Sequence, residues 1–133
     1  MKSTILEIFK FGVIGGIGFL VDAGVLYLLK DSLGLYFARV ISFICAVIAT
    51  WLLNRSITFA KSKVTHRRSK EFALYFLVML VGGCINIGCY VLMVNSSILV
   101  REYPILGVAV GSLAGMITNF TFSKKLIYKK QHS

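Results

Sequence analysis

Several polar or charged side chains lie inside long apolar runs or at their ends, and their types suit the binding of an anionic ligand. These candidates are Asp22, Arg39, Asn54, Arg55, Asn86, Asn119 and Lys124. A guanidinium offers a planar pair of donors to a phosphate, whereas an ammonium offers a point charge. The acid and the asparagines supply polar groups between the cations. The sequence therefore predicts basic contacts for an anion at two faces, with polar groups between them.

The chain shows no grouping typical of catalysis or of metal binding. No nucleophile, base and orienting group occur together, and no pair of carboxylates is present. His66 and His132 stand alone, and the cysteines lie inside apolar runs without the spacing of metal ligands; they are Cys45, Cys84 and Cys89. We therefore expect no enzyme, no cofactor and no metal, with the cysteines acting as small apolar fillers.

Asp22 is unusual because it lies deep in an apolar run. It follows Lys10 by twelve residues, which is ~18 Å along a helix. An ionisable group at that depth in a membrane costs several kcal/mol unless it is paired or hydrated. We expect a polar site at the membrane midplane, between the two halves of the chain and shared with Asn86. The alternative is structural: an interhelical hydrogen bond, or an aspartic acid held protonated.

The cations fall into an outer and an inner group. Arg39 opens the second apolar run and is predicted to contact an anion near the outer face, with an interfacial anchor as the alternative. Arg55 and Lys124 end equivalent runs and, with Asn54 and Lys125, are predicted to form a basic cluster at the inner face. Topology alone would explain the cations but not the asparagine. Asn119, deeper in the fourth run, has less structural reason to be polar and is predicted to be functional.

Four apolar runs carry these residues, at 11–29, 37–59, about 72–94 and about 105–122. The chain of 133 residues is 57% apolar and has a net charge of +10, and its mean hydropathy is +0.82. Such a charge often indicates nucleic-acid binding, but here the cations cluster at the ends of the apolar runs. The pattern predicts an all-α integral membrane protein, with four transmembrane helices in a single domain over 1–133 and no nucleic-acid partner.

The connections between the runs predict the orientation in the membrane. Residues 30–36 and a loop at 95–104 join the runs on one side, and the polar stretch 60–71 joins them on the other. Four spans put both termini on the side of 60–71, where the N-terminus, this loop and the tail are all basic. Because cytoplasmic connections carry the excess of Lys and Arg, we predict that both termini and the basic loop 60–71 are cytoplasmic.

The two halves of the chain repeat each other, at about 8–59 and about 72–128. An offset of 64 aligns Gly18, Asp22, Gly24 and Leu28 with Gly82, Asn86, Gly88 and Leu92. An offset of 69 aligns Ala38, Ser42, Ala46 and Thr50 with Gly107, Gly111, Gly115 and Asn119, and then Arg55 with Lys124. Two helices separate the copies, so we predict two helical hairpins in a parallel repeat, related by an axis along the membrane normal. The stripes of small residues are predicted to be packing faces.

The segments 38–43 (ARVISF) and 54–59 (NRSITF) resemble the GtrA-like family of small bacterial membrane proteins. The family pattern begins with Ala-Arg-x-x-Ser-Phe and ends with Asn-Arg-x-x-Thr-Phe. The resemblance extends over nearly the whole chain, through Lys10-Phe11, Val13, Gly15, Asp22 and Asn119-Phe120. Departures are Thr50 where Asn is common, no Arg or Lys near Tyr75, and Ser56-Ile57 in place of an Arg-Trp pair.

The resemblance implies a multi-pass protein of the bacterial cytoplasmic membrane that acts in cell-surface polysaccharide or teichoic acid glycosylation. Members are thought to move a polyprenyl-phosphate-linked sugar to the outer leaflet, where a separate glycosyltransferase uses it. Basic groups at both faces suit the anionic headgroup of such a lipid. No nucleotide-binding motif is present, so we expect transport to run downhill. Four helices barely enclose a path for a sugar, and a homodimer is one way to complete it.

Two other functions remain open at this stage. One is a small multidrug or metabolite transporter that exchanges protons through Asp22, although the aligned Asn86 would then lack a titrating group. The other is a membrane subunit that recruits or anchors a glycosyltransferase without transporting anything.

Overall fold

The computed structural model describes residues 2–129, and all the long elements of this part of the chain are helices. Its elements are α1 (Lys2–Leu33), α2 (Leu35–Leu53), η1 (Asn54–Thr58), α3 (Arg68–Ser96), α4 (Ile98–Glu102), α5 (Pro104–Phe122) and η2 (Ser123–Ile127). They form two compact units, residues 2–63 and Val64–Lys129.

The prediction of four long apolar helices is confirmed. The candidate membrane spans are Ser3–Leu33, Leu35–Thr58, Arg68–Ser96 and Pro104–Ile127. The shorter spans have 24 residues, or ~36 Å of helix, which is enough to cross a hydrocarbon core of ~30 Å. The chain is therefore a multi-pass membrane protein.

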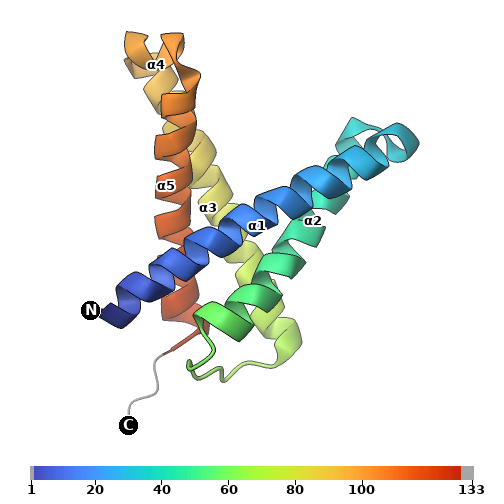
Figure 1. The fold of residues 1–133 in the computed structure, drawn as a ribbon, viewed down its shortest axis with the longest axis vertical. Coiled ribbons are helices and arrows are strands. Elements are labelled where there is room, and N and C mark those ends of the chain that lie inside the picture. The colour runs from blue at the N-terminus through green and yellow to red at the C-terminus, as the bar shows by residue number, and fades with distance from the viewer. Residues whose placement is uncertain (1, 130–133) are drawn as a thin grey trace. The chain divides into compact units, whose positions relative to one another are not determined.

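In the first unit, α1 and α2 form a hairpin that turns at a single residue (Figure 1). Gly34 has a φ of 82°, a conformation that glycine adopts without strain because it lacks a Cβ. The predicted connection at 30–36 was too long, because the leucine-rich ends of both runs stay helical up to this glycine. Its N–H donates to Lys30 O, and its carbonyl accepts from the N–H of Ala38.

Small residues bring α1 and α2 together. Ala38, Ser42 and Ala46 are all buried on α2, and Gly18 of α1 lies directly against the Thr50 side chain and the Ala46 carbonyl. A side chain on this glycine would separate the helices. The prediction that this stripe of small residues is a packing face is confirmed.

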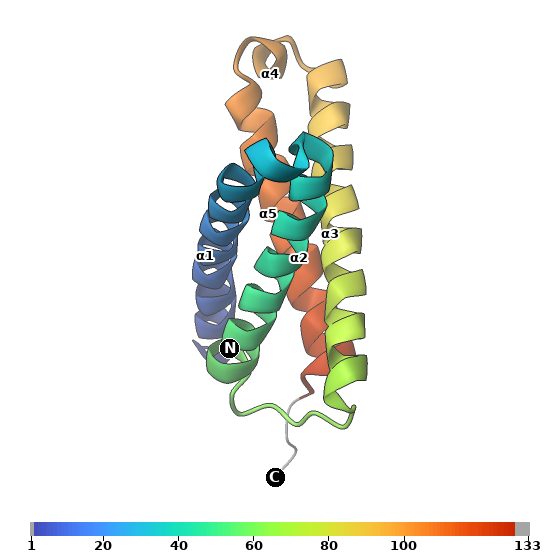
Figure 2. The ribbon, with the colours of Figure 1, turned by 90° about the vertical axis from the view of Figure 1, so that its right-hand side faces the viewer.

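In the second unit, α3 and α5 lie side by side and α4 joins them at one end (Figure 2). The predicted loop at 95–104 contains this short helix because Ser97 Oγ accepts from the N–H of Val100 as an N-cap. Pro104 then begins α5, where the missing N–H of proline is no loss. Gly111 and Gly115 of α5 meet the backbone of α3, so the second stripe also packs against a helix.

Each hairpin ends in a π-helical turn that the sequence analysis did not predict. The N–H of Phe59 donates to Asn54 O at 2.8 Å, and the N–H of Tyr128 donates to Ser123 O at 2.9 Å. Bonds between residues i and i+5 are rare in proteins and are frequent at functional sites. They place one extra residue in the last turn of each hairpin, just where Arg55 and Lys124 stand.

The basic loop is shorter than predicted, because α3 already begins at Arg68 and its first turn contains Glu71. Glu71 was expected in the loop at 60–71, but it is fully buried in the first turn of α3. A carboxylate is favourable there because the exposed N–H groups of a helix start carry partial positive charge.

We predict that enlarging Gly111 disrupts the second hairpin. An ideal Cβ at this position would lie 2.5 Å from the backbone oxygen of Asn86, which cannot move aside as a side-chain end can. Gly111→Leu should therefore lower the yield of monodisperse detergent-solubilised protein and its thermal midpoint. Gly83→Leu is the matched control, because a Cβ there meets nothing within 4 Å. Equal behaviour of the two variants would contradict the assigned packing.

Candidate functional site

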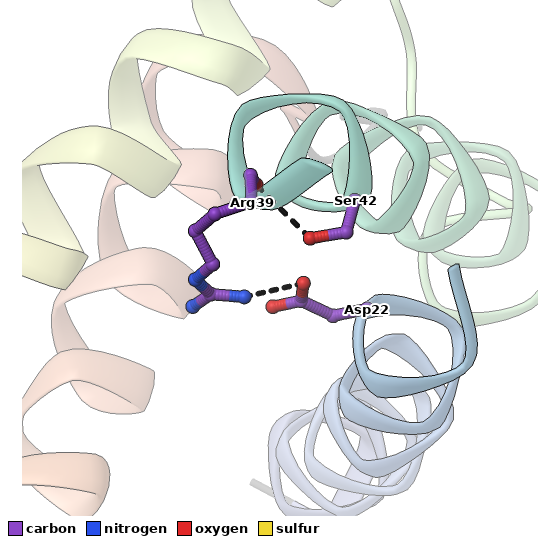
Figure 3. A network of polar contacts seen from close by, with 3 residues as sticks. All are labelled: Asp22, Arg39 and Ser42. Atoms are coloured by element: carbon purple, nitrogen blue, oxygen red, sulfur yellow. Dashed lines mark hydrogen bonds and ion pairs between the residues drawn. The ribbon is translucent and has the colours of Figure 1, made fainter. Parts of the chain in front are cut away.

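Asp22 and Arg39 form an ion pair in the first unit. Arg39 Nη1 donates to Asp22 Oδ1 at 2.5 Å, so α1 and α2 are joined by opposite charges (Figure 3). The Arg39 carbonyl accepts from Ser42 Oγ at 2.9 Å. The Arg39 side chain is 57% exposed, whereas that of Asp22 is 16% exposed. The acidic side chain is thus mostly covered, whereas more than half of the arginine side chain is accessible.

From the sequence, these two residues were expected at different depths, Asp22 at the midplane and Arg39 near the outer face. The structure brings them together because an arginine side chain is long enough to run along a neighbouring helix. Pairing lowers the free-energy cost of placing a charge in an apolar span, both for the Arg39 cation and for the Asp22 carboxylate.

The second unit has no such pair at the aligned positions. Asn86 takes the place of Asp22, and Val108 takes the place of Arg39. The Asn86 side chain lies against α5, since an ideal Cβ at Gly111 would be 2.6 Å from its Oδ1. A neutral amide packed against a glycine thus replaces the charged contact.

Asn119 lies on α5 with its carboxamide directly against Gly82 of α3. Its Oδ1 is buried and has no hydrogen-bond partner within the described residues. An unsatisfied buried acceptor costs ~1–3 kcal/mol. In the first unit the aligned contact joins Thr50 and Gly18, and there the Thr50 hydroxyl is satisfied by the Val47 carbonyl at 3.1 Å.

Asn54 and Arg55 begin the π-turn of the first unit, and their environments differ. Asn54 is 1% exposed, and its Oδ1 accepts from the Thr58 hydroxyl at 2.7 Å. The positive-inside rule does not explain an asparagine at this position, but this hydrogen bond within the turn does. Arg55 is half-buried at the same end of the hairpin, and it is the cation of this turn.

Lys124 begins the aligned turn of the second unit. Its Nζ lies 5.5 Å from the centroid of the Phe120 ring, within the range of a cation–π contact. Ser123 before it is fully buried, and its hydroxyl has no partner within the described residues. Lys124 therefore occupies the same place in its unit as Arg55 does in the first, on a turn with a buried polar residue before it.

Glu71 is a residue of this region that the sequence analysis missed. The Tyr128 hydroxyl donates to Glu71 Oε2 at 3.1 Å, and both side chains are fully buried. This bond ties the start of α3 to the residue just after η2. The signal was available, because the offset of 64 that aligns Asp22 with Asn86 also aligns Glu7 with Glu71.

No metal site is found in the described part of the chain, where no three His, Cys, Asp or Glu side chains are grouped for one ion. What the arrangement offers is a cation on each π-turn, an ion pair inside the first unit and carboxamides inside the second. By their chemistry, each of these cations can bind an anion, and the carboxamides can offer hydrogen bonds to a polar group. It contains no group positioned as a nucleophile with a base beside it.

We predict that Tyr128→Phe destabilises the second unit. The substitution keeps the ring but removes a hydroxyl that donates to a buried carboxylate, so the loss should be ~1–3 kcal/mol. Denaturation of the purified protein in mild detergent measures it. Tyr103→Phe is the control, because Tyr103 is 57% exposed. Equal stability of both variants would show that the Glu71–Tyr128 bond contributes nothing.

Comparison with protein families gives a match over most of the chain. The sequence profile described as the GtrA/DPMS transmembrane domain matches residues 10–128. This range contains all four long helices apart from the first turns of α1, and every candidate residue discussed above. A search of curated proteins found no match.

Proposed function

Because the chain belongs to the GtrA/DPMS transmembrane domain family, we propose that it moves a polyprenyl-phosphate-linked monosaccharide from the cytoplasmic to the outer leaflet. The family is associated with polyprenyl-linked sugar translocation in cell-surface glycosylation. The match over residues 10–128 is the observation that carries this proposal. It is supported by the four candidate spans and by cations at the ends of both hairpins. The protein itself carries out no bond chemistry in this proposal.

In the proposed arrangement the two hairpins are parallel repeats, and both termini face the cytoplasm. The same pair of aligned positions is in contact in each unit, Gly18 with Thr50 and Gly82 with Asn119, which supports the repeat. The basic residues of the N-terminus, of the loop before α3 and of η2 support a cytoplasmic location for this end of each hairpin. The membrane is the bacterial cytoplasmic membrane.

Each candidate residue has a role in this proposal. Arg55 and Lys124 capture the lipid phosphate at the cytoplasmic face, and Asn54 shapes the turn that presents the arginine. The sugar then passes polar side chains, those of Asp22, Asn86 and Asn119, while the isoprenoid tail stays in lipid. Arg39 contacts the phosphate on its way to the outer leaflet.

The energy for this transport comes from consumption of the sugar outside. A glycosyltransferase at the outer face is therefore the expected partner, in the synthesis of a surface polysaccharide or teichoic acid. A second copy of the chain would enlarge the polar path. The ion pair with Arg39 gives Asp22 a partner inside its own hairpin, so the presence of this acid in an apolar span does not by itself call for a proton-exchanging transporter.

We predict that the turn at Gly34 and the start of α3 face opposite sides of the membrane. In a variant without native cysteines, Ser32→Cys should react with an impermeant maleimide in intact cells, whereas Ser69→Cys should react only after lysis. Both serines are exposed, so access to each thiol depends on the membrane and not on burial. The reverse labelling pattern would exchange the two faces and contradict the proposed direction of capture.

We predict that Arg55 captures the phosphate. Loss of one charged hydrogen-bonded contact weakens binding by ~1.5–3 kcal/mol, so Arg55→Ala should raise the KM for transport by roughly tenfold or more. Arg55→Lys should fall between the parent and Arg55→Ala, because lysine keeps the charge but loses the planar fork. The assay is transfer of a short-chain polyprenyl-phosphate sugar into vesicles that contain equal amounts of protein.

Arg67→Ala is the control for these variants, because Arg67 is an exposed cation of the loop before α3. Its removal changes the charge of the same face by the same amount, and it should leave the KM near that of the parent. If Arg55→Ala transports as well as Arg67→Ala, Arg55 only anchors the helix and the headgroup is bound elsewhere.

A further inference from the structure

We propose that Arg39, held in place by Asp22, is a phosphate site inside the membrane span. This inference rests on the proposed function and names the contact that the phosphate makes after it leaves the cytoplasmic face. Asp22 is then a positioning residue, because it fixes the guanidinium and does not itself touch the anion. The ligand class is a phosphate ester.

The guanidinium of Arg39 uses only part of its bonding capacity. Nη1 binds Asp22 Oδ1, and within residues 2–129 neither Nε nor Nη2 has a hydrogen-bond partner. Figure 3 shows the guanidinium turned toward the carboxylate. The free nitrogens define an edge whose donors match two oxygens of a phosphate. The Arg39 side chain as a whole is 57% exposed, so the hairpin does not enclose it.

The position of the guanidinium is set by its partner on α1 and not by the place of Arg39 on its own helix. Arg39 lies four residues after the start of α2 at Leu35, which is ~6 Å along the helix. An arginine so close to a helix end would ordinarily extend toward the headgroups. Asp22 lies eleven residues before the end of α1 at Leu33, or ~16 Å along that helix. Pairing with it therefore draws the cation away from the headgroups and into the span.

The aligned hairpin of the second unit packs without an ion pair at these positions. The second unit packs α3 against α5 with Asn86 and Val108 at the aligned positions, and the closest approach there is made by Gly111. A pair that served packing alone would be covered on both sides, whereas only the Asp22 carboxylate is covered here. A neutral pair also allows the site to stay empty inside lipid, where a lone cation would be costly.

A binding experiment tests the site without relying on transport. The probe is a short-chain polyprenyl phosphate without a sugar, added to the protein in nanodiscs of phosphatidylethanolamine. In an Arg55→Ala/Lys124→Ala background, which removes the proposed cytoplasmic contacts, residual binding should fall at least fivefold on adding either Asp22→Asn or Arg39→Gln. Inorganic phosphate should not compete at millimolar concentration if the site takes lipid phosphate alone, and competition would show that it takes free phosphate as well.

A charge exchange separates positioning from a structural ion pair. Asp22→Arg/Arg39→Asp keeps both charges and should restore thermal stability toward that of the parent. It should not restore probe binding, because the guanidinium then extends from α1 and its unpaired nitrogens no longer occupy the same place. In the transport assay, Asp22→Asn should lower the maximal rate at least fivefold with little change in KM. Arg55→Ala, by contrast, is expected to act on the KM for transport.

Two results would overturn the inference: unchanged or tighter probe binding in Asp22→Asn, or full recovery of binding in the charge exchange. Either would leave Asp22 and Arg39 as a structural pair. Failure of the parent to transport any lipid-linked sugar would instead contradict the proposed function. Binding that depends on Asp22 and Arg39 would in that case still establish the phosphate site.

Discussion

Close approach of helix backbones is the constraint on which each hairpin depends. Lipid chains are as apolar as leucine, so helices in a membrane gain little by hiding side chains and associate through packing and polar pairing. Gly111 and Gly115 place α5 directly on the backbone of α3, and the small residues of α2 do the same for α1. A polar side chain in such a helix contact has no water to bind. It must therefore form a hydrogen bond or ion pair within the protein, or its burial costs free energy.

The two units meet this requirement in different ways at aligned positions. The first uses a charged pair, Asp22 with Arg39, and satisfies the Thr50 hydroxyl on its own helix. The second uses neutral amides and leaves the Oδ1 of Asn119 and the hydroxyl of Ser123 without partners among the described residues. At these positions one unit thus carries a charged pair, whereas the other carries neutral polar groups.

Much of the fold could be predicted from the sequence because membrane spans are set by length and hydropathy. The four spans and the packing role of the small-residue stripes follow from local pattern. Side-chain partners do not, because they depend on which residues two helices bring to the same level. Asp22 and Arg39 were expected at different depths, and Glu71 was assigned to a loop although it is buried against Tyr128. The π-turns have no sequence signal comparable to a cap or a proline.

Transbilayer movement of the lipid-linked sugar by the purified protein tests the central claim most directly. Sealed vesicles carry a short-chain polyprenyl-phosphate sugar in both leaflets, and an impermeant oxidant such as periodate is added outside. The account predicts that the inner-leaflet sugar becomes oxidised in vesicles with the protein and stays protected in vesicles without it, while a trapped soluble sugar survives in both. If the inner pool stays protected in the presence of folded protein, the chain does not translocate this lipid, and the account is contradicted.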